Sequence, residues 1–367
     1  MEYIGKKFHR EILMLVACVT MLFSGTSSVN AADIATYIEL KTAIQNGEAE
    51  INLLNNISDV TGDFGVLSGS GNYVKINGSN KYGINSAGYN GLTVGNNNTL
   101  ELYGIGATDD WDDSIISSWT NVGGVDSSVL KIEQTGTVIS ENTVFTNNVS
   151  AVINEGLYTS RFGWFEQNQN VEGGAAILSE NADTIIHSGV FKKNIADELH
   201  GGAIYSIDSD LKIENSIFDG NLALDKAYNP ADSSTVAGDG GAIKIYSGQF
   251  NISDTQFSYN QSQFGNGGAL YNDVGSGSIT NAVFSNNLAL NGSGGAVYNH
   301  TGSTIDKLTG EFTANRAETG GAIYNDNKIL DLQGTFTGNS AGSGGAIFND
   351  NVLYISNSEF TANATTG

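Results

Sequence analysis

Three of the four histidines, those that lie beyond the first 31 residues, are the first residues to consider for acid–base or metal chemistry. His187, His200 and His300 lie far apart in the chain, and none belongs to a His-Glu-x-x-His or cysteine-based metal pattern. A catalytic pair or a zinc site needs its groups within bonding reach of one another. These histidines would meet only if the fold stacked them, so each is expected to be an exposed turn residue. The sequence therefore predicts no catalytic, cofactor-binding or metal-binding residue.

The carboxylates offer a second kind of chemistry, which is calcium binding. The run Asp109-Asp110-Trp111-Asp112-Asp113 groups several carboxylates of the kind that bind Ca²⁺. A solvated acidic loop is the simpler interpretation of the same run, and both stay open here. The stretch 238–241, Gly-Asp-Gly-Gly, is similar to a calcium-binding nonapeptide but lacks the nine-residue period. The other turn carboxylates are scattered, at Asp208, Asp210, Asp254, Asp273, Asp326 and Asp350.

The composition limits the partners. Charged residues make up 15% of the 367 residues, yet the formal net charge is -23. An acidic chain repels phosphate backbones, so nucleic acid is not expected as a partner. Glycine is abundant, at 47 residues, and Pro230 is the only proline. This combination is typical of short strands joined by tight turns, and the 40% apolar content is enough for a core.

The first 31 residues are predicted to be a signal peptide. A basic segment, 6–10, precedes an apolar run, 12–23, and small polar residues follow. The apolar run is too short to span a bilayer, and cleavage is predicted after Ala31. An alternative starts from Cys18, the only cysteine, which a lipoprotein signal would lipidate. Cleavage after Ala31 would leave a chain without disulfides or cysteine-bound zinc.

Residues 32–50 are predicted to cap the fold with one short helix. Within Asp33–Gln45 apolar side chains recur at helical spacing, and Gly47 follows where a helix would stop. A helix before the first strand covers the open end of a stack. Residues 51–144 then contain short alternating stretches separated by Gly, Asn and Ser, without a strict repeat. We expect them to form irregular early rungs of the same stack.

Two short motifs alternate along residues 145–367. Their period is mostly 24 to 28 residues, which indicates a solenoid. One motif is Phe-x-x-Asn, which begins at Phe145, Phe165, Phe191, Phe218, Phe257, Phe284, Phe312, Phe336 and Phe360. The other is Gly-Gly-Ala, with the glycine pairs Gly173-Gly174, Gly201-Gly202, Gly240-Gly241, Gly267-Gly268, Gly294-Gly295, Gly320-Gly321 and Gly344-Gly345.

One unit decides which solenoid the repeat builds. Within 320–343 the sequence predicts strands at 322–324 and 329–332, a turn at Gly334, and a third strand that carries Phe336 and ends at Asn339. Three short strands leave no room for a helix in each unit. The sequence therefore predicts an all-β, right-handed parallel β-helix. In such a coil Phe stacks inward at the strand spacing, the glycine pair forms a turn, and Asn forms an amide ladder.

Two positions depart from the repeat. Leu222–Asp239 holds an insertion where other units use a few residues, and it carries Pro230. Loops that project from a rigid scaffold often bind partners, so this segment is either a binding loop or a tolerated insertion. At Gly367 the chain ends where a further Gly-Gly-Ala is due. We expect the repeats to be truncated there, as a piece of a longer protein.

The alternation of Gly-Gly-Ala-Ile, at Gly201–Ile204, Gly320–Ile323 and Gly344–Ile347, with Phe-x-x-Asn resembles a known passenger repeat. It is similar to the repeats of polymorphic outer-membrane proteins, which belong to the autotransporter-type surface proteins. The resemblance covers about 145–367. It implies a secreted passenger displayed at the outer membrane of a Gram-negative bacterium, which adheres to a host or cell-surface receptor or glycan. It also implies attachment through a C-terminal membrane barrel that is not present in this chain.

Three functions follow from these observations. The leading hypothesis is a surface-exposed or secreted β-helix that presents loops for adhesion and is not an enzyme. A secreted polysaccharide lyase or hydrolase is the first alternative, because a fold alone does not exclude catalysis. That activity would need clustered carboxylates on one face of adjacent rungs. The second alternative is a structural spacer that holds another domain away from the cell.

Overall fold

The computed structural model describes residues 31–85, 89, 91–106, 128–171, 173–224 and 238–366. The chain divides into two compact units, 1–31 and 32–367, and all that follows concerns the second unit. The predicted signal peptide before Ala31, Cys18 within it and the acidic run 109–113 lie outside the described residues. Among the residues that are described, no helix is both long and apolar enough to cross a membrane.

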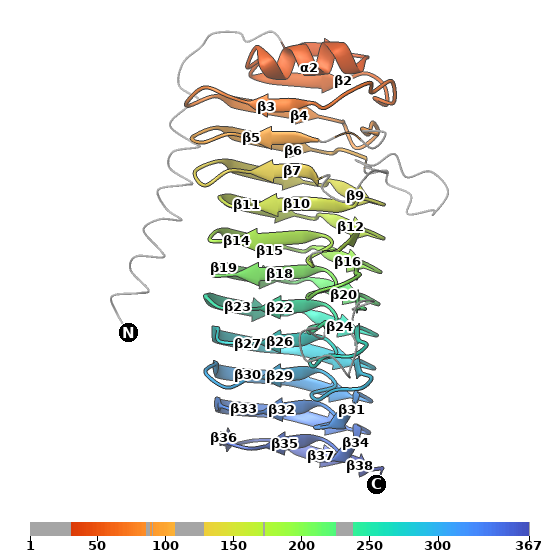
Figure 1. The fold of residues 1–367 in the computed structure, drawn as a ribbon, viewed down its shortest axis with the longest axis vertical. Coiled ribbons are helices and arrows are strands. Elements are labelled where there is room, and N and C mark those ends of the chain that lie inside the picture. Colours follow the sequence, from red (N-terminus) through yellow and green to blue (C-terminus); the bar gives the residue numbers. More distant parts are fainter. Residues whose placement is uncertain are drawn as a thin grey trace. The chain divides into compact units, whose positions relative to one another are not determined.

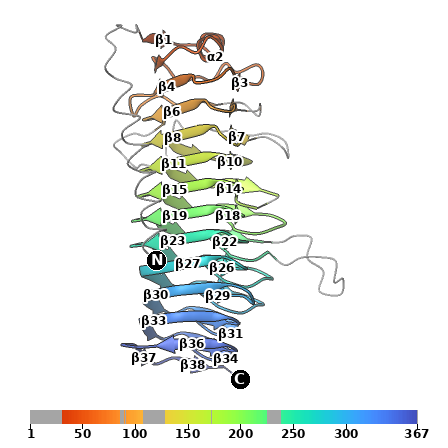
Figure 2. The same ribbon diagram turned by 90° about the vertical axis from the view of Figure 1, so that its left-hand side faces the viewer.

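The second unit is a stack of parallel strands in three sheets, confirming the prediction of an all-β parallel β-helix (Figures 1 and 2). The stack has about ten turns. In a complete rung the chain passes through the second sheet, then the first, then the third. Each strand pairs in parallel with the equivalent strand one rung away, as β29, β32 and β35 do in the second sheet.

The three sheets contain the following strands. The first sheet, of 19 strands, consists of β1 Ala32–Ile34, β2 Glu50–Leu53, β4 Tyr73–Asn77, β6 Thr99–Tyr103, β8 Thr137–Glu141, β9 Val144–Thr146, β11 Leu157–Arg161, β12 Trp164–Glu166, β15 Asp183–His187, β16 Val190–Lys192, β19 Asp210–Glu214, β20 Ile217–Asp219, β23 Gln249–Ser253, β24 Gln256–Ser258, β27 Ser276–Ser285, β30 Thr304–Thr313, β33 Lys328–Thr337, β36 Val352–Ile355 and β37 Glu359–Thr361. The second sheet, of 11 strands, consists of β3 Gly65–Leu67, β5 Leu92–Val94, β7 Ser128–Ile132, β10 Ser150–Asn154, β14 Ile177–Glu180, β18 Ile204–Ile207, β22 Ile243–Ile245, β26 Leu270–Asn272, β29 Val297–Asn299, β32 Ile323–Asn325 and β35 Ile347–Asn349. The third sheet, of 8 strands, consists of β13 Gln169–Asn170, β17 Ile195–Ala196, β21 Leu222–Ala223, β25 Gln261–Ser262, β28 Leu288–Ala289, β31 Arg316–Thr319, β34 Ser340–Ser343 and β38 Ala364–Thr365.

The helix begins later than the sequence predicted. Helix α2 spans Tyr37–Gln45, while Ala32–Ile34 is strand β1, which pairs in parallel with β2. The helix starts after Thr36 because a capping box forms there: the Thr36 side chain accepts from the backbone of Glu39, whose carboxylate accepts from the Thr36 backbone. Leu40 of α2 is fully buried and belongs to the hydrophobic core. The helix therefore covers the first rung (Figure 1).

The first sheet also differs from the predicted unit, because Gly334 is not a turn. Gly334 lies inside the long strand β33, in register with Gly310 of β30. In earlier rungs the same path is two strands, such as β23 and β24, separated by Asp254 with a positive φ of 51°. The third strand of the rung begins at Ser340, after Asn339. Among the described residues the third sheet begins at β13, so the early irregular rungs use the other two sheets.

Candidate functional site

The phenylalanines of Phe-x-x-Asn form one continuous stack inside the coil. Neighbouring rings lie 4.5–5.1 Å apart between centroids and are nearly parallel. All members from Phe145 to Phe336 are fully buried, and the terminal Phe360 is 49% exposed. Parallel strands place equivalent residues one strand spacing apart, so the rings pack face to face. The rings from Phe145 to Phe336 are therefore interior and are not available to a ligand.

The asparagines of the same motif form a buried hydrogen-bonded ladder. At Asn287, Nδ2 donates to Asn315 Oδ1 at 3.0 Å and to the Phe257 carbonyl at 2.9 Å, and Oδ1 accepts from Asn260. Each rung repeats this arrangement. The residue before each ladder Asn has a left-handed backbone, with φ of 52–65°, at Asn147, Gln167, Lys193, Gly220, Tyr259, Asn286, Ala314, Gly338 and Ala362. The motif is therefore a tight corner whose buried backbone polar groups are satisfied by Asn.

The glycine pair lies where neighbouring backbone leaves no room for a side chain. Gly320 has φ of 66°, and a Cβ there would meet the Ile323 carbonyl at 2.3 Å. A Cβ on Gly321 would meet the carbonyl of Gly345 in the next rung at 2.1 Å. Both positions exclude a side chain for steric reasons. Close backbone contacts therefore explain why the two glycines of the Gly-Gly-Ala motif recur in each unit.

A second pair of ladders was not found from the sequence. Outward-facing rings stack at 4.8–5.1 Å, in the order Tyr271, Tyr298, Tyr324 and Phe348. The next residue in each rung is an inward Asn, and these also donate to one another, in the order Asn272, Asn299, Asn325 and Asn349. The signal is the recurring aromatic-Asn pair that follows Gly-Gly-Ala by one residue. It could have been recognised by aligning the units on their glycines.

The structure brings two of the three histidines to one charged cluster. His200 and His300 lie at either side of Lys244 and its carboxylates, whereas His187 pairs with Glu214 on another face at 2.9 Å. The prediction that each histidine is an exposed turn residue is wrong for His200, which is only 7% exposed. His200 and Asp239 are 39 residues apart in the sequence but lie on neighbouring rungs. The His200 ring therefore packs against Asp239, whose backbone N–H donates to its Nδ1.

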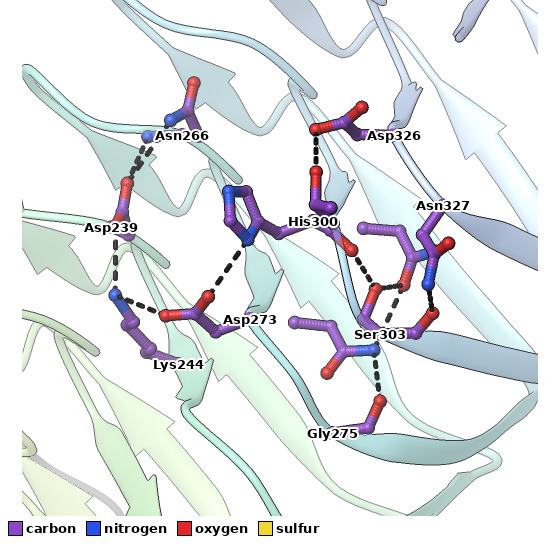
Figure 3. Close-up of polar contacts among 12 residues, drawn as sticks. Asp239, Lys244, Asn266, Asp273, Gly275, His300, Ser303, Asp326 and Asn327 are labelled. Atoms are coloured by element: carbon purple, nitrogen blue, oxygen red, sulfur yellow. Dashed lines mark hydrogen bonds and ion pairs between the residues drawn. The ribbon is translucent and has the colours of Figure 1, made fainter. Parts of the chain in front are cut away.

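The Lys244 cluster consists of Lys244, Asp239, Asp273, His200 and His300. Figure 3 labels its members other than His200. Lys244 Nζ lies 3.0 Å from Asp239 Oδ2 and 3.6 Å from Asp273 Oδ2. His300 Nδ1 lies 3.1 Å from Asp273 Oδ1, close enough for an ion pair but not aligned as a hydrogen bond. Lys244 occupies the outward position that Tyr271 takes in the next rung, and its ammonium lies 4.5 Å from that ring. The cluster was missed because its members come from different rungs.

Burial controls the protonation of this cluster. The side chains of Lys244 and Asp239 are 5% and 11% exposed. Burial, with Lys244 as a second cause, lowers the pKa of His200 to about 3. His200 is therefore neutral, and its Nδ1 accepts the backbone N–H of Asp239 at 3.0 Å. The 3.7 Å approach of that nitrogen to Asp239 Oδ2 is thus not an ion pair. Burial also raises the pKa of Asp239.

Metal binding finds no support in the part of the chain that the structure covers. The described residues contain no group of three or more His, Cys, Asp or Glu side chains that could hold a metal ion. The Asp109–Asp113 run, the candidate for calcium, lies outside them. Asp239 of the Gly-Asp-Gly-Gly stretch is instead bonded to Lys244 and to the backbone N–H of Asn266.

The insertion predicted at Leu222–Asp239 is narrower than the sequence indicated. Leu222 and Ala223 form β21 of the third sheet, and Asp239 belongs to the Lys244 cluster. Successive ladder residues show its length, since Asn221 and Asn260 are 39 residues apart where Asn194 and Asn221 are 27 apart. Residues 225–237 lie outside the described residues.

The motif residues described above can be compared with those of known proteins. A family model of the Chlamydia polymorphic membrane protein repeat matches the chain at residues 281–300 and 333–350. Each matched stretch runs through one Phe-x-x-Asn motif, one glycine pair and one aromatic-Asn pair. No curated protein and no solved structure matches the chain. Residues 281–300 and 333–350, which contribute to the inner and outer ladders, are therefore similar to the Chlamydia polymorphic membrane protein repeat.

Proposed function

We propose that this chain is a secreted β-helical passenger, displayed at the outer-membrane surface of a Gram-negative bacterium, that adheres to a receptor or glycan on another cell. The observation that carries the proposal is the match of the polymorphic membrane protein repeat to two rungs of a continuous parallel stack. Both the repeat family and the solenoid fit a surface-displayed passenger. The predicted signal peptide, cleaved after Ala31, agrees with export.

The surface that would bind a partner is restricted by the ladders. The phenylalanines and ladder asparagines before the last rung are interior, so they contribute rigidity and not recognition. In the outward aromatic ladder the ring faces cover one another at 4.8–5.1 Å. A sugar ring that packs flat on an aromatic face therefore has no free face along this ladder. We place adhesion outside the ladders, foremost in the insertion at 225–237.

Neither Glu214 nor Asp239 is suited to act as the general acid of glycan cleavage, which favours adhesion. A general acid for glycoside hydrolysis needs a raised pKa. Partial burial raises the pKa of Glu214, but Lys212 and His187 outweigh this effect and leave it below its ordinary value. Asp239, whose pKa is raised by burial, is enclosed against Lys244 and does not face a substrate. We therefore propose a binding role without catalysis.

A cell-binding assay tests adhesion against the spacer alternative. The fluorescently labelled full chain is added to target cells, and bound protein is measured over a concentration series. One variant shortens 225–237 while keeping β21 and Asp239, and a matched variant replaces the same residues with Gly and Ser at equal length. We expect saturable binding that both variants reduce at least tenfold. Absence of saturable binding by the unaltered chain would contradict the adhesion proposal. Binding that both variants retain would show that the insertion is not the adhesive segment.

Glycan cleavage is tested separately with the same preparation. The full chain is incubated with acidic and neutral polysaccharides, and new reducing ends or unsaturated products are measured. We expect none above a heat-treated control. Turnover of any polysaccharide would favour the lyase or hydrolase alternative.

A further inference from the structure

Lys244 is enclosed in a way that the surface ion pairs of this chain are not. Its Nζ lies between two carboxylates, 3.0 Å from Asp239 Oδ2 and 3.6 Å from Asp273 Oδ2, and its side chain is 5% exposed. The Tyr271 ring covers the ammonium at 4.5 Å. An amine, a carboxyl group to react with it and a second carboxyl group to move protons therefore meet in one enclosed site (Figure 3). We propose that Lys244 and Asp239 condense into an intramolecular isopeptide bond between Nζ and Cγ.

Burial favours the neutral forms that condensation needs. Two opposite charges in a medium of low dielectric lose much of their hydration, and transfer of one proton from the ammonium to the carboxylate removes both charges. The raised pKa of Asp239, which follows first from burial, acts in the same direction. His200 does not oppose the transfer, because its Nδ1 accepts the Asp239 backbone N–H and the ring is neutral.

The surrounding groups supply the other requirements of the reaction. The backbone N–H of Asn266 donates to Asp239 Oδ1 at 2.8 Å, so it can stabilise the oxyanion that develops on this oxygen. Asp273 Oδ2 is close enough to Nζ to receive its proton. His300 Nδ1 stands 3.1 Å from the other oxygen of Asp273.

The reaction balances without a co-reactant. A proton first passes from the Lys244 ammonium to the Asp239 carboxylate, and the free amine then attacks Cγ to form the Nζ–Cγ bond. Asp273 takes a proton from Nζ and gives it to the hydroxyl oxygen of the tetrahedral intermediate. The Cγ–O bond to that oxygen breaks and one water leaves, with no change in oxidation state.

The Lys212–Glu214 pair provides a matched comparison within the same chain. Its Nζ and carboxylate oxygen are closer, at 2.8 Å, but the two side chains are 24% and 31% exposed. Hydration keeps such a pair ionised, and an ammonium is not a nucleophile. Enclosure rather than proximity therefore separates the pair that condenses from the pair that does not.

The bond would close a small ring across the Gly240-Gly241 turn. This turn is where the chain enters β22 after the insertion, so the amide would hold the end of the insertion to the rung. Unlike the ion pair, the amide does not depend on pH or salt.

Peptide mass spectrometry of the full chain tests the proposal. Trypsin normally cleaves after Lys226, Lys244 and Lys307, which would release 227–244 and 245–307 as separate peptides. The isopeptide bond predicts a single peptide, 227–307, lighter than its sequence by one water, with fragment ions that join Asp239 to Lys244. Cleavage after Lys212 in the same digest should be normal. Recovery of 227–244 at its full sequence mass as the main species would overturn the proposal.

Two variants separate the roles in the reaction. Lys244→Arg keeps the positive charge but cannot condense in this way, so the water-loss peptide should disappear. Asp273→Asn keeps the shape of the side chain but cannot relay a proton, so it should leave Lys244 and Asp239 unlinked. Equal condensation in Asp273→Asn would overturn the role of Asp273. Fragment ions that join Lys244 to Asp273 instead would overturn the assignment of the bond.

Discussion

At the residue scale, the repeat places a left-handed backbone at the position before each ladder asparagine. That residue adopts φ of 52–65° whether it is Gly220, Ala314 or Lys193. Left-handed backbone costs about 1–2 kcal/mol for a residue with a Cβ and little for glycine. The strain persists because the following Asn completes hydrogen bonds to two other rungs. The place in the repeat therefore sets the left-handed conformation, and the residue type changes only the free energy that this conformation costs.

Ala314→Gly should stabilise the chain by about 0.5–1 kcal/mol, because relief of left-handed strain exceeds the added freedom of the unfolded backbone. Ala314 is exposed and has φ of 54°, so the change removes no packed side chain. Urea unfolding followed by circular dichroism measures the shift. Thr313→Gly, one residue earlier in β30, is the matched control and should destabilise. A loss of stability in Ala314→Gly would contradict the strain assigned to this position.

Asn287→Ala should destabilise by about 3 kcal/mol, because it strands several buried polar groups. The substitution leaves the Asn260 backbone N–H and the Phe257 carbonyl without their partner. Asn363→Ala, at the half-buried end of the ladder, should cost much less. Chemical unfolding of both variants measures the difference. Equal losses would argue against a ladder whose value depends on burial.

His200 should make the stability of the chain fall as the pH falls. Its pKa drops from the ordinary 6.5 to about 3 in the folded chain, mainly because of burial. Below pH 6.5 the unfolded chain takes up a proton that the folded chain does not, so stability is present above this pH and is lost towards pH 3. The loss is at most about 1.4 kcal/mol per pH unit. Urea midpoints from pH 7 to pH 5 should fall more steeply for the unaltered chain than for His200→Gln. Identical slopes would contradict a buried neutral His200.

At the element scale, the chain sets its rungs by corners and caps more than by strand propensity. The sequence predicted the strands of 145–367, the glycine pairs and the inward Phe because these recur at a visible period. It placed the helix start too early, because the capping box at Thr36 and the pairing of β1 with β2 are local events within a run of helical pattern. It also missed the Lys244 cluster. Those side chains come from neighbouring rungs, and the insertion lengthens the spacing between equivalent residues there from 27 to 39 residues.

Thr36→Ala should loosen α2 without unfolding the stack. The change removes the side-chain oxygen that accepts from the Glu39 backbone, and loss of an N-cap costs about 1 kcal/mol. Hydrogen exchange should accelerate in Tyr37–Gln45 and stay unchanged in β29 and β32. Thr42→Ala, inside the helix, is the control and should have a smaller effect. Faster exchange throughout the second sheet would show that the helix is essential to the stack.

At the scale of the whole molecule, each rung contacts only its neighbours, and continuity comes from ladders that run through many rungs. Stability in such an array is close to a sum of rung and interface terms, so local losses need not unfold the rest. Apart from the outward aromatic ladder, the repeat residues are used inside the coil, which leaves the rest of the outer face and the loops free to vary. This division agrees with a passenger whose scaffold is constant and whose contacts lie at its surface.

Surface exposure in the cell that makes the chain tests the central claim most directly. Antibodies against the purified full chain are applied to intact cells and to permeabilised cells, with a cytoplasmic protein as the internal control. We expect equal labelling of the chain in both preparations, while the control labels only after permeabilisation. Labelling of the chain only after permeabilisation would contradict a surface-displayed passenger.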